Sequence, residues 1–302
     1  MNHFRYLIHL AYEGTCYCGW QIQPNGLSIQ QLIEEVLETL FSKKIRLFGA
    51  GRTDAGVHAT RQSAHFTLER REEPSRILRA LNGQLPSDIR LLSCLPVPET
   101  FHAQFSAIQK EYHYHIWQDR FVDPFSRHYR YHFPYPLSLP LLEKGAKFMT
   151  GRHDFTSFTN RGSSVKSTVR TIHRIECIPQ EGGFRLEFEG EGFLYKMVRN
   201  LVGTLLEVGR GKRALEDIPS LLEAKDRRCT GMAAPAKGLF LHRVDYPSHF
   251  FVREEKEEET VTPLLVKEAA SSLEMSSESS TDLAPDPIRA LSPLGESSNP
   301  IT

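Results

Sequence analysis

The strongest constraint on the fold is an alternation of strand-like and helical segments in the first hundred residues. Residues 28–41 have the clearest helical pattern, with apolar side chains at the helical period and Ser28 and Gln31 in a capping-box arrangement. Short strand-like runs and a second helix, which begins at Pro74, surround it: strands at 4–11, 45–49, 64–68 and 89–95, and the helix at 74–81. This order predicts an α+β unit.

The second half of the chain repeats this order. Its elements are strands at 110–117, 173–178, 184–189 and 239–244, and helices at 138–149 and 194–208. We therefore expect an α+β fold with two ferredoxin-like or RNP-like domains, whose antiparallel sheets form a central cleft. The predicted boundaries are 1–105 for the N-terminal domain, 106–247 for the C-terminal domain and 248–302 for a tail.

The tail differs from the rest in composition and charge. It contains the acidic run 254–259 and then mainly Ser, Pro, Glu and Asp with almost no aromatic residues, which predicts disorder. Residues 253–302 hold 4 of the 37 basic and 11 of the 37 acidic residues, so the first 252 residues carry a net charge of +7. A basic body is compatible with a polyanionic partner.

Cysteine usage and the N-terminal residues exclude several classes of protein. The five cysteines are scattered and form no Cys-x-x-Cys pair, so we expect neither a disulfide framework nor a structural zinc site. The first ten residues contain no apolar run long enough for a signal peptide or a membrane helix. These features predict a cytoplasmic protein without membrane contact.

The segment 49–56, GAGRTDAG, is a candidate for chemistry because its glycines let the backbone approach a ligand closely. Asp54 stands where a dinucleotide-binding fingerprint needs its third glycine, and Val57 and His58 follow where a Walker loop needs Lys and Ser or Thr. Two interpretations remain. Asp54 either caps a tight turn, or is an ionised carboxylate held for catalysis beside a cation such as Arg52.

Ordered motifs along the chain carry a resemblance to a known family. The segment 48–59, FGAGRTDAGVHA, closely resembles the signature of the tRNA pseudouridine synthase A family. Further matches follow in order: YEGT at 12–15, GWQ at 19–21, SIQ at 28–30, LNGQLPSDI at 81–89, FHA at 101–103, FSA at 105–107, YHY at 112–114, GFLYKMVRN at 192–200 and PAKGLFL at 235–241. The resemblance covers residues 4–246 and leaves the tail outside.

The resemblance implies an isomerase that converts uridine to pseudouridine at positions 38–40 of the tRNA anticodon stem-loop, without a cofactor or a metal. It places the catalytic carboxylate on Asp54 and its arginine partner on Arg199. It also implies substrate binding by Tyr112, which would stack on an extruded uracil, and by Arg52 through phosphate contact. Asp54 would either add to the sugar or the uracil ring, or remove a C2′ proton. A homodimer that receives the anticodon arm of tRNA is implied as well.

The sequence departs from the family pattern at Gln104 and Gln109, where basic residues are usual. Other basic residues could supply the phosphate contacts: Arg127, Arg130, Arg161, Lys166 and Arg170. Two alternative functions are an RNA-binding module without catalysis and a metal-dependent hydrolase that uses Asp54, His58 and His65. No recognisable ligand spacing supports the hydrolase.

Overall fold

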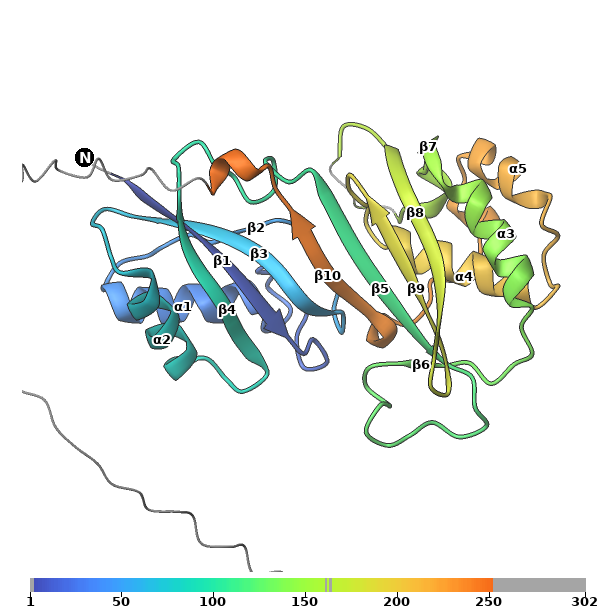
Figure 1. The fold of residues 1–302 in the computed structure, drawn as a ribbon, viewed down its shortest axis with the longest axis horizontal. Helices are drawn as coiled ribbons and strands as arrows, with labels where there is room; N and C mark the ends of the chain where they lie inside the picture. The colour runs from blue at the N-terminus through green and yellow to red at the C-terminus, as the bar shows by residue number, and fades with distance from the viewer. Residues whose placement is uncertain (1–2, 161, 163–164, 252–302) are drawn as a thin grey trace, which may run out of the picture. The chain divides into compact units, whose positions relative to one another are not determined.

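The computed structural model describes residues 3–160, 162 and 165–251, which form one sheet and five α-helices (Figure 1). The strands are β1 (Phe4–Tyr12), β2 (Phe48–Gly49), β3 (His58–Leu68), β4 (Ile89–Val97), β5 (Gln109–Trp117), β6 (Tyr131–His132), β7 (Gly151–Asp154), β8 (Val169–Gln180), β9 (Gly183–Gly190) and β10 (Leu239–Asp245). The helices are α1 (Ile29–Phe41), α2 (Pro74–Gln84), α3 (Leu139–Met149), α4 (Met197–Gly209) and α5 (Asp217–Ala224). The predicted α+β class is confirmed.

The sheet runs without interruption through both halves of the described chain. Its strand order is β4-β1-β3-β10-β5-β9-β8-β7, with β2 paired to β3 and β6 paired to β5. The pairs β10–β3 and β5–β6 are parallel, and the other pairs are antiparallel. Because β10 lies between β3 and β5, the last strand of the sequence joins the strands of the first half to those of the second.

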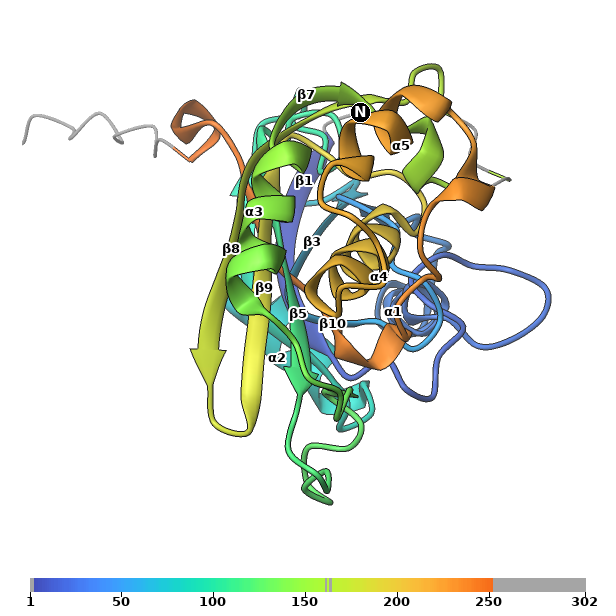
Figure 2. The same ribbon diagram turned by 90° about the vertical axis from the view of Figure 1, so that its right-hand side faces the viewer.

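The helices bury one face of the sheet. Figure 2 shows α1 and α4 on the same side of it. On β5, Tyr114 and Ile116 are fully buried, and Tyr112 is nearly so. In α4, the apolar stripe that includes Leu201 and Leu205 is also fully buried. The core therefore lies between the helices and this face of the sheet.

Local interactions and backbone conformation set the first residues of α1 and α4. Ser28 is the N-cap of α1, and its side chain accepts a hydrogen bond from the backbone N–H of Gln31 at 3.2 Å. Helix α4 begins at Met197, later than the predicted Leu194, because Lys196 adopts a left-handed conformation with φ 59°.

Several elements differ from the predictions. Strand β3 begins at His58, six residues before the predicted start, and its added residues include the buried polar side chains of His58, Gln62 and Ser63. The predicted strand 45–49 is reduced to β2. Elements β6, β7 and α5 were not predicted.

The start of the predicted tail packs on the body. Residues Ser248–Phe250 form a short 3-10 turn in which Phe250 lies edge to face on Phe101, with ring centroids 5.2 Å apart. The rest of the predicted tail, residues 252–302, lies outside the described residues. In the described part of the chain, no helix combines the length and apolar character needed to cross a membrane.

Candidate active site

The glycine-rich segment predicted to carry Asp54 is the loop between β2 and β3, and hydrogen bonds fix it along its length. The backbone N–H of Ala50 donates to the carbonyl of Ser63 at 2.7 Å, and the Gln62 side chain donates to the carbonyl of Gly51 at 2.9 Å. The Thr53 hydroxyl bonds the hydroxyl of Tyr12 at 2.8 Å in a buried contact. A loop held this way presents Asp54 in one orientation.

Two glycines allow this loop to be packed so closely. Gly19 has φ 95°, and a Cβ at this position would lie 2.4 Å from the carbonyl oxygen of Thr53. Gly56 has φ 75°, a left-handed conformation that directs the chain into β3. Glycine is therefore required at position 19 because segment 19–20 approaches the loop closely. It is required at position 56 because the chain turns there as it leaves the loop.

Asp54 and Arg199 form an ion pair. The Arg199 Nη1 donates to Asp54 Oδ2 at 2.8 Å, and the Arg199 Nε donates to the carbonyl of Ala234 at 2.7 Å. Both side chains are half-buried, with exposed fractions of 14% for Arg199 and 16% for Asp54. A guanidinium anchored at a second point holds the carboxylate by a charge-assisted hydrogen bond while leaving part of it accessible. This pairing was expected from the family resemblance, and helix α4 carries Arg199 to Asp54.

Tyr112 lies on the helix-covered face of β5, next to the loop that carries Asp54. A Cβ at Gly51 would lie 3.8 Å from its hydroxyl, and its ring meets Phe193 edge to face with centroids 5.1 Å apart. Burial raises the pKa of Tyr112 well above its ordinary value, and the charges of Tyr12 and Asp54 raise it further. The phenol is therefore neutral at physiological pH. Tyr114, by contrast, is a core residue whose hydroxyl donates to the carbonyl of Pro235.

Lys110 is a further residue of this site, and it was not predicted from the sequence. Its Nζ donates to the carbonyl of Ala50 at 2.7 Å and would lie 3.4 Å from a Cβ at Gly51. Burial and the nearby charge of Arg170 lower the pKa of Lys110 from 10.5 to about 8. Lys110 lies two residues before Tyr112 on the same face of β5, and its hydrogen bond helps to hold the loop. The sequence signal for Lys110 was its spacing of two residues from Tyr112, and a solvated lysine could have the same spacing.

The other residues named from the sequence have different positions. Arg52 is exposed, and within the described ranges it forms no ion pair, so its guanidinium is free to meet a phosphate. His58 is fully buried: its Nδ1 accepts from the backbone N–H of Gly14 and its Nε2 donates to the carbonyl of His128. His58 therefore fixes the loop instead of contacting a ligand. Arg161 lies outside the described residues.

The geometry does not assemble a metal centre around Asp54. His58 uses both ring nitrogens within the fold, and His65 Nδ1 accepts from the backbone N–H of Ala103 at 3.1 Å. Among the described residues, the one group with convergent ligand atoms is Glu111, His113 and His242, which does not include Asp54. The hydrolase alternative therefore lacks its ligands.

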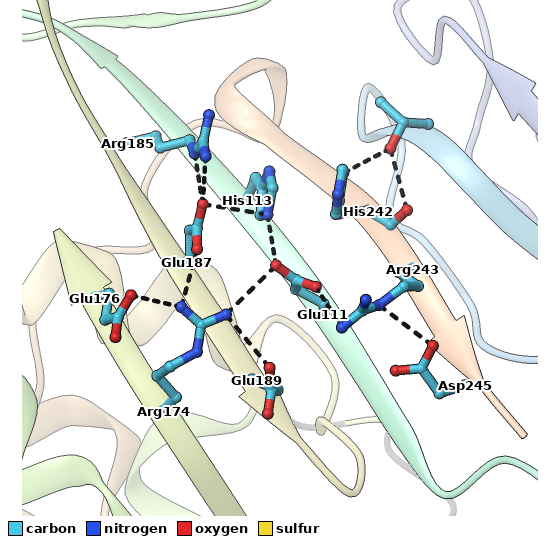
Figure 3. A network of polar contacts seen from close by, with 11 residues as sticks. Glu111, His113, Arg174, Glu176, Arg185, Glu187, Glu189, His242, Arg243 and Asp245 are labelled. Atoms are coloured by element: carbon cyan, nitrogen blue, oxygen red, sulfur yellow. Dashed lines mark hydrogen bonds and ion pairs between the residues drawn. The ribbon is translucent and has the colours of Figure 1, made fainter. Parts of the chain in front are cut away.

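That group belongs to an ion-pair network on β5, β8, β9 and β10 (Figure 3). The carboxylate of Glu111 already binds His113 at 2.8 Å, Arg243 at 3.1 Å and Arg174 at 3.7 Å. The rings of His113 and His242 stack face to face with centroids 3.8 Å apart. Guanidinium groups occupy the space beside the carboxylate where a cation would bind, so the arrangement favours strand-to-strand ion pairing.

Comparison with known proteins agrees with these features. The model of a family described as tRNA pseudouridine synthase matches residues 8–106 and 146–247, which include Asp54 and Arg199 but not Tyr112. The tRNA pseudouridine synthase A 1 of Protochlamydia amoebophila is 53% identical over 80% of this chain and 96% of that protein. The tRNA pseudouridine synthases A of an Exiguobacterium species and of Chlamydia muridarum are 44% and 43% identical, over 78% and 82% of this chain and 96% and 95% of their own lengths.

Proposed function

The chain belongs to the tRNA pseudouridine synthase family, and from this premise we propose that it isomerises uridine to pseudouridine at positions 38–40 of the tRNA anticodon stem-loop. In this isomerisation the bond between N1 and C1′ breaks and a bond between C5 and C1′ forms, while C5 loses a proton and N1 gains one. No electron is gained or lost overall. The reaction therefore needs acid–base groups and a carboxylate, and no redox cofactor.

The observation that carries the proposal is the ion pair between Asp54 and Arg199. We assign Asp54 as the catalytic carboxylate. Either route begins from its ionised form: addition to the sugar or uracil, or removal of the C2′ proton. An arginine bound to one carboxylate oxygen, Oδ2, holds the group by a charge-assisted hydrogen bond and leaves Oδ1 for the substrate.

Tyr112 is assigned to the uracil. The family resemblance assigns its ring, which is nearly buried and packs edge to face on Phe193, to stacking on the extruded base, and stacking of this kind contributes about 1–3 kcal/mol per base. Its neutral hydroxyl can donate a hydrogen bond to the uracil while the ring turns. Arg52, exposed two residues before Asp54, is assigned to the backbone phosphates.

Three further properties belong to the proposal. The enzyme works as a homodimer in which each active site receives the anticodon arm across both subunits, it acts in the cytoplasm, and it is organised as the two domains 1–105 and 106–247. The family resemblance supports the first two. The repeated order of strands and helices along the sequence supports the third.

The test uses the full-length protein, an unmodified tRNA transcript and excess EDTA. Pseudouridine is then mapped by carbodiimide modification and primer extension. Formation of pseudouridine at positions 38–40 in the presence of chelator is the expected result, and it excludes both a metal-dependent hydrolase and an RNA-binding module without catalysis. A transcript that stays unmodified at every enzyme concentration would overturn the proposed function.

A further inference from the structure

Two large apolar side chains, Phe105 and Phe48, are exposed and belong to one stack of rings. Phe105 is 77% exposed and Phe48 is 38% exposed. The ring of His102 lies between them, with centroids 4.3 Å from Phe105 and 5.7 Å from Phe48, and the guanidinium of Arg46 lies 5.2 Å over the Phe48 ring. We call Arg46, Phe48, His102 and Phe105 the aromatic platform.

The platform is held rigidly by the turn that follows Phe101. His102 Nδ1 accepts from the backbone N–H of Gln104 at 3.1 Å and of Phe105 at 3.4 Å, and the Ser106 hydroxyl accepts from the backbone N–H of His102 at 3.0 Å. Burial, together with the charge of Arg5, lowers the pKa of His102, so its ring stays neutral and keeps accepting these bonds. The exposed Phe105 therefore projects from a fixed turn.

The other end of the platform is fixed by the sheet. Phe48 stacks on His65, its partner in the β2–β3 register, with centroids 5.1 Å apart and an angle of 16° between the rings. His65 is buried, and burial first, then the charges of His102 and Arg5, lowers its pKa to about 3. Fixed aromatic faces bind planar ligands at a low cost in conformational entropy.

A basic hollow of about 750 Å³ adjoins the platform and shares Arg46 and Phe48 with it. The remaining cations that line it are Arg5, Lys43, Lys44 and Arg70, against the acids Glu69 and Glu99. Lys43 is paired with Glu69, whereas Lys44 and Arg46 are exposed and, within the described part of the chain, form no ion pair. The hollow therefore favours an anion next to a surface that favours planar rings.

The platform is continuous with the catalytic loop in the chain. Phe48 and Gly49 form β2, and the loop that carries Asp54 follows directly. Gly49 itself leaves room for the indole of Trp20, since a Cβ there would lie 2.4 Å from its Nε1. Because successive side chains of a strand point to opposite faces, Phe48 lies on the other face of the sheet from Trp20.

We propose that the aromatic platform stacks unpaired bases of the RNA substrate, while the basic hollow holds the phosphates of the same strand. This proposal rests on the proposed function and extends it to a second contact region. Proteins recognise single-stranded RNA loops by stacking bases on aromatic rings and arginine planes beside cationic grooves. A protein partner would use the apolar area of Phe105 but would not require the adjoining excess of cations.

The test measures binding of an anticodon stem-loop RNA that carries 2-aminopurine in its loop. The variants are F105A, F105L and F105W, with F148A as the matched control, because Phe148 is 44% exposed on α3. We expect F105A and F105L to bind about tenfold more weakly and to lose the quenching of 2-aminopurine fluorescence, since one stack is removed. F105W and F148A keep the wild-type affinity and quenching.

A second part of the test removes positive charges from the basic hollow. Lys44→Gln and Arg46→Gln each reduce the slope of log affinity against log salt by about one, because each removes one phosphate contact. F105L that binds like wild type, or F105A that binds like F148A, overturns the platform. These binding outcomes do not depend on turnover: an inactive wild type that still shows Phe105-dependent quenching would defeat the proposed function and leave the platform standing.

Discussion

Arg199 on α4 reaches across 145 positions of sequence to hold Asp54 Oδ2 at 2.8 Å, and its Nε is anchored on the carbonyl of Ala234. The backbone N–H of Ala234 in turn donates to the carbonyl of Arg199 at 3.0 Å, so the segment before β10 and the start of α4 are tied together. The orientation of the carboxylate thus depends on three separate parts of the fold: the β2–β3 loop, α4 and the segment 231–238.

Arg199→Met removes the charge and the hydrogen bond from Asp54 and leaves similar apolar bulk. A hydrogen bond to a charged group contributes about 1.5–3 kcal/mol, so the single-turnover rate constant should fall by about 10- to 100-fold. Arg199→Lys should recover only part of this loss, because an ammonium cannot bind Asp54 and the Ala234 carbonyl as the planar guanidinium does. Rapid-quench assays with enzyme in excess over tRNA measure both.

The control for these variants is Arg210→Met. Arg210 is the C-cap residue of the same helix and lies 4.0 Å over the ring of Tyr135, away from the ion pair. It should keep a rate constant within about twofold of wild type. An Arg199→Met enzyme as fast as Arg210→Met would show that the ion pair does not support the reaction.

Tyr112→Phe separates the two roles assigned to this residue, because the ring remains and the hydroxyl does not. If the hydroxyl donates to the uracil during catalysis, the rate constant at saturating tRNA falls while the dissociation constant stays within about twofold. Tyr112→Leu removes the ring as well and should also weaken binding by about fivefold or more, in line with the loss of one stack. Equal rates for Tyr112→Phe and wild type would leave only the stacking role.

The lowered pKa of Lys110 should make the free energy of unfolding depend on pH. Its pKa is about 8 in the folded protein and near 10.5 unfolded, so between these values the unfolded state binds more protons and the free energy of unfolding rises with pH. Burial of the charged form thus destabilises the fold fully below pH 8, and the penalty falls as the pH rises from 8 to 10.5. From pH 7 to pH 9.5, wild type should gain on the order of 1–2 kcal/mol relative to Lys110→Met.

Urea denaturation of both proteins at the two pH values measures this difference, and other titrating groups cancel in the comparison. Lys110→Met should also reduce turnover, because the Ala50 carbonyl loses its donor. A constant difference in stability between pH 7 and pH 9.5 would show that Lys110 keeps its ordinary pKa and is not buried beneath the loop.

The sequence predicted the long periodic elements well and missed those whose pattern is weak or interrupted. Helix α5 has only eight residues and contains Pro219, which is typical of a helix end, yet Ile218, Leu221 and Leu222 are buried against neighbouring elements. The first half of β3 is polar and has no alternation. Its Gln62 and Ser63 are buried because they bond the catalytic loop and His9.

The residues of the site also divide into those that were predicted and one that was missed. Asp54, Tyr112 and Arg199 were expected from the family resemblance, and the structure places Asp54 and Arg199 in contact. No local pattern could have related residues that far apart. Lys110 was missed because a lysine on a strand is ordinarily solvated, and only its tertiary contact with the Ala50 carbonyl partly buries it.

The central claim, that Asp54 is the catalytic carboxylate, is tested most directly by Asp54→Asn, which keeps the shape of the side chain and removes its charge. Asp119→Asn, an exposed position outside the site, is the control. Both are assayed for pseudouridine formation and for tRNA affinity. We predict that Asp54→Asn forms no pseudouridine while its dissociation constant for tRNA stays within a few-fold of wild type, and that Asp119→Asn matches wild type. Turnover by Asp54→Asn at a rate comparable to Asp119→Asn would contradict the assignment.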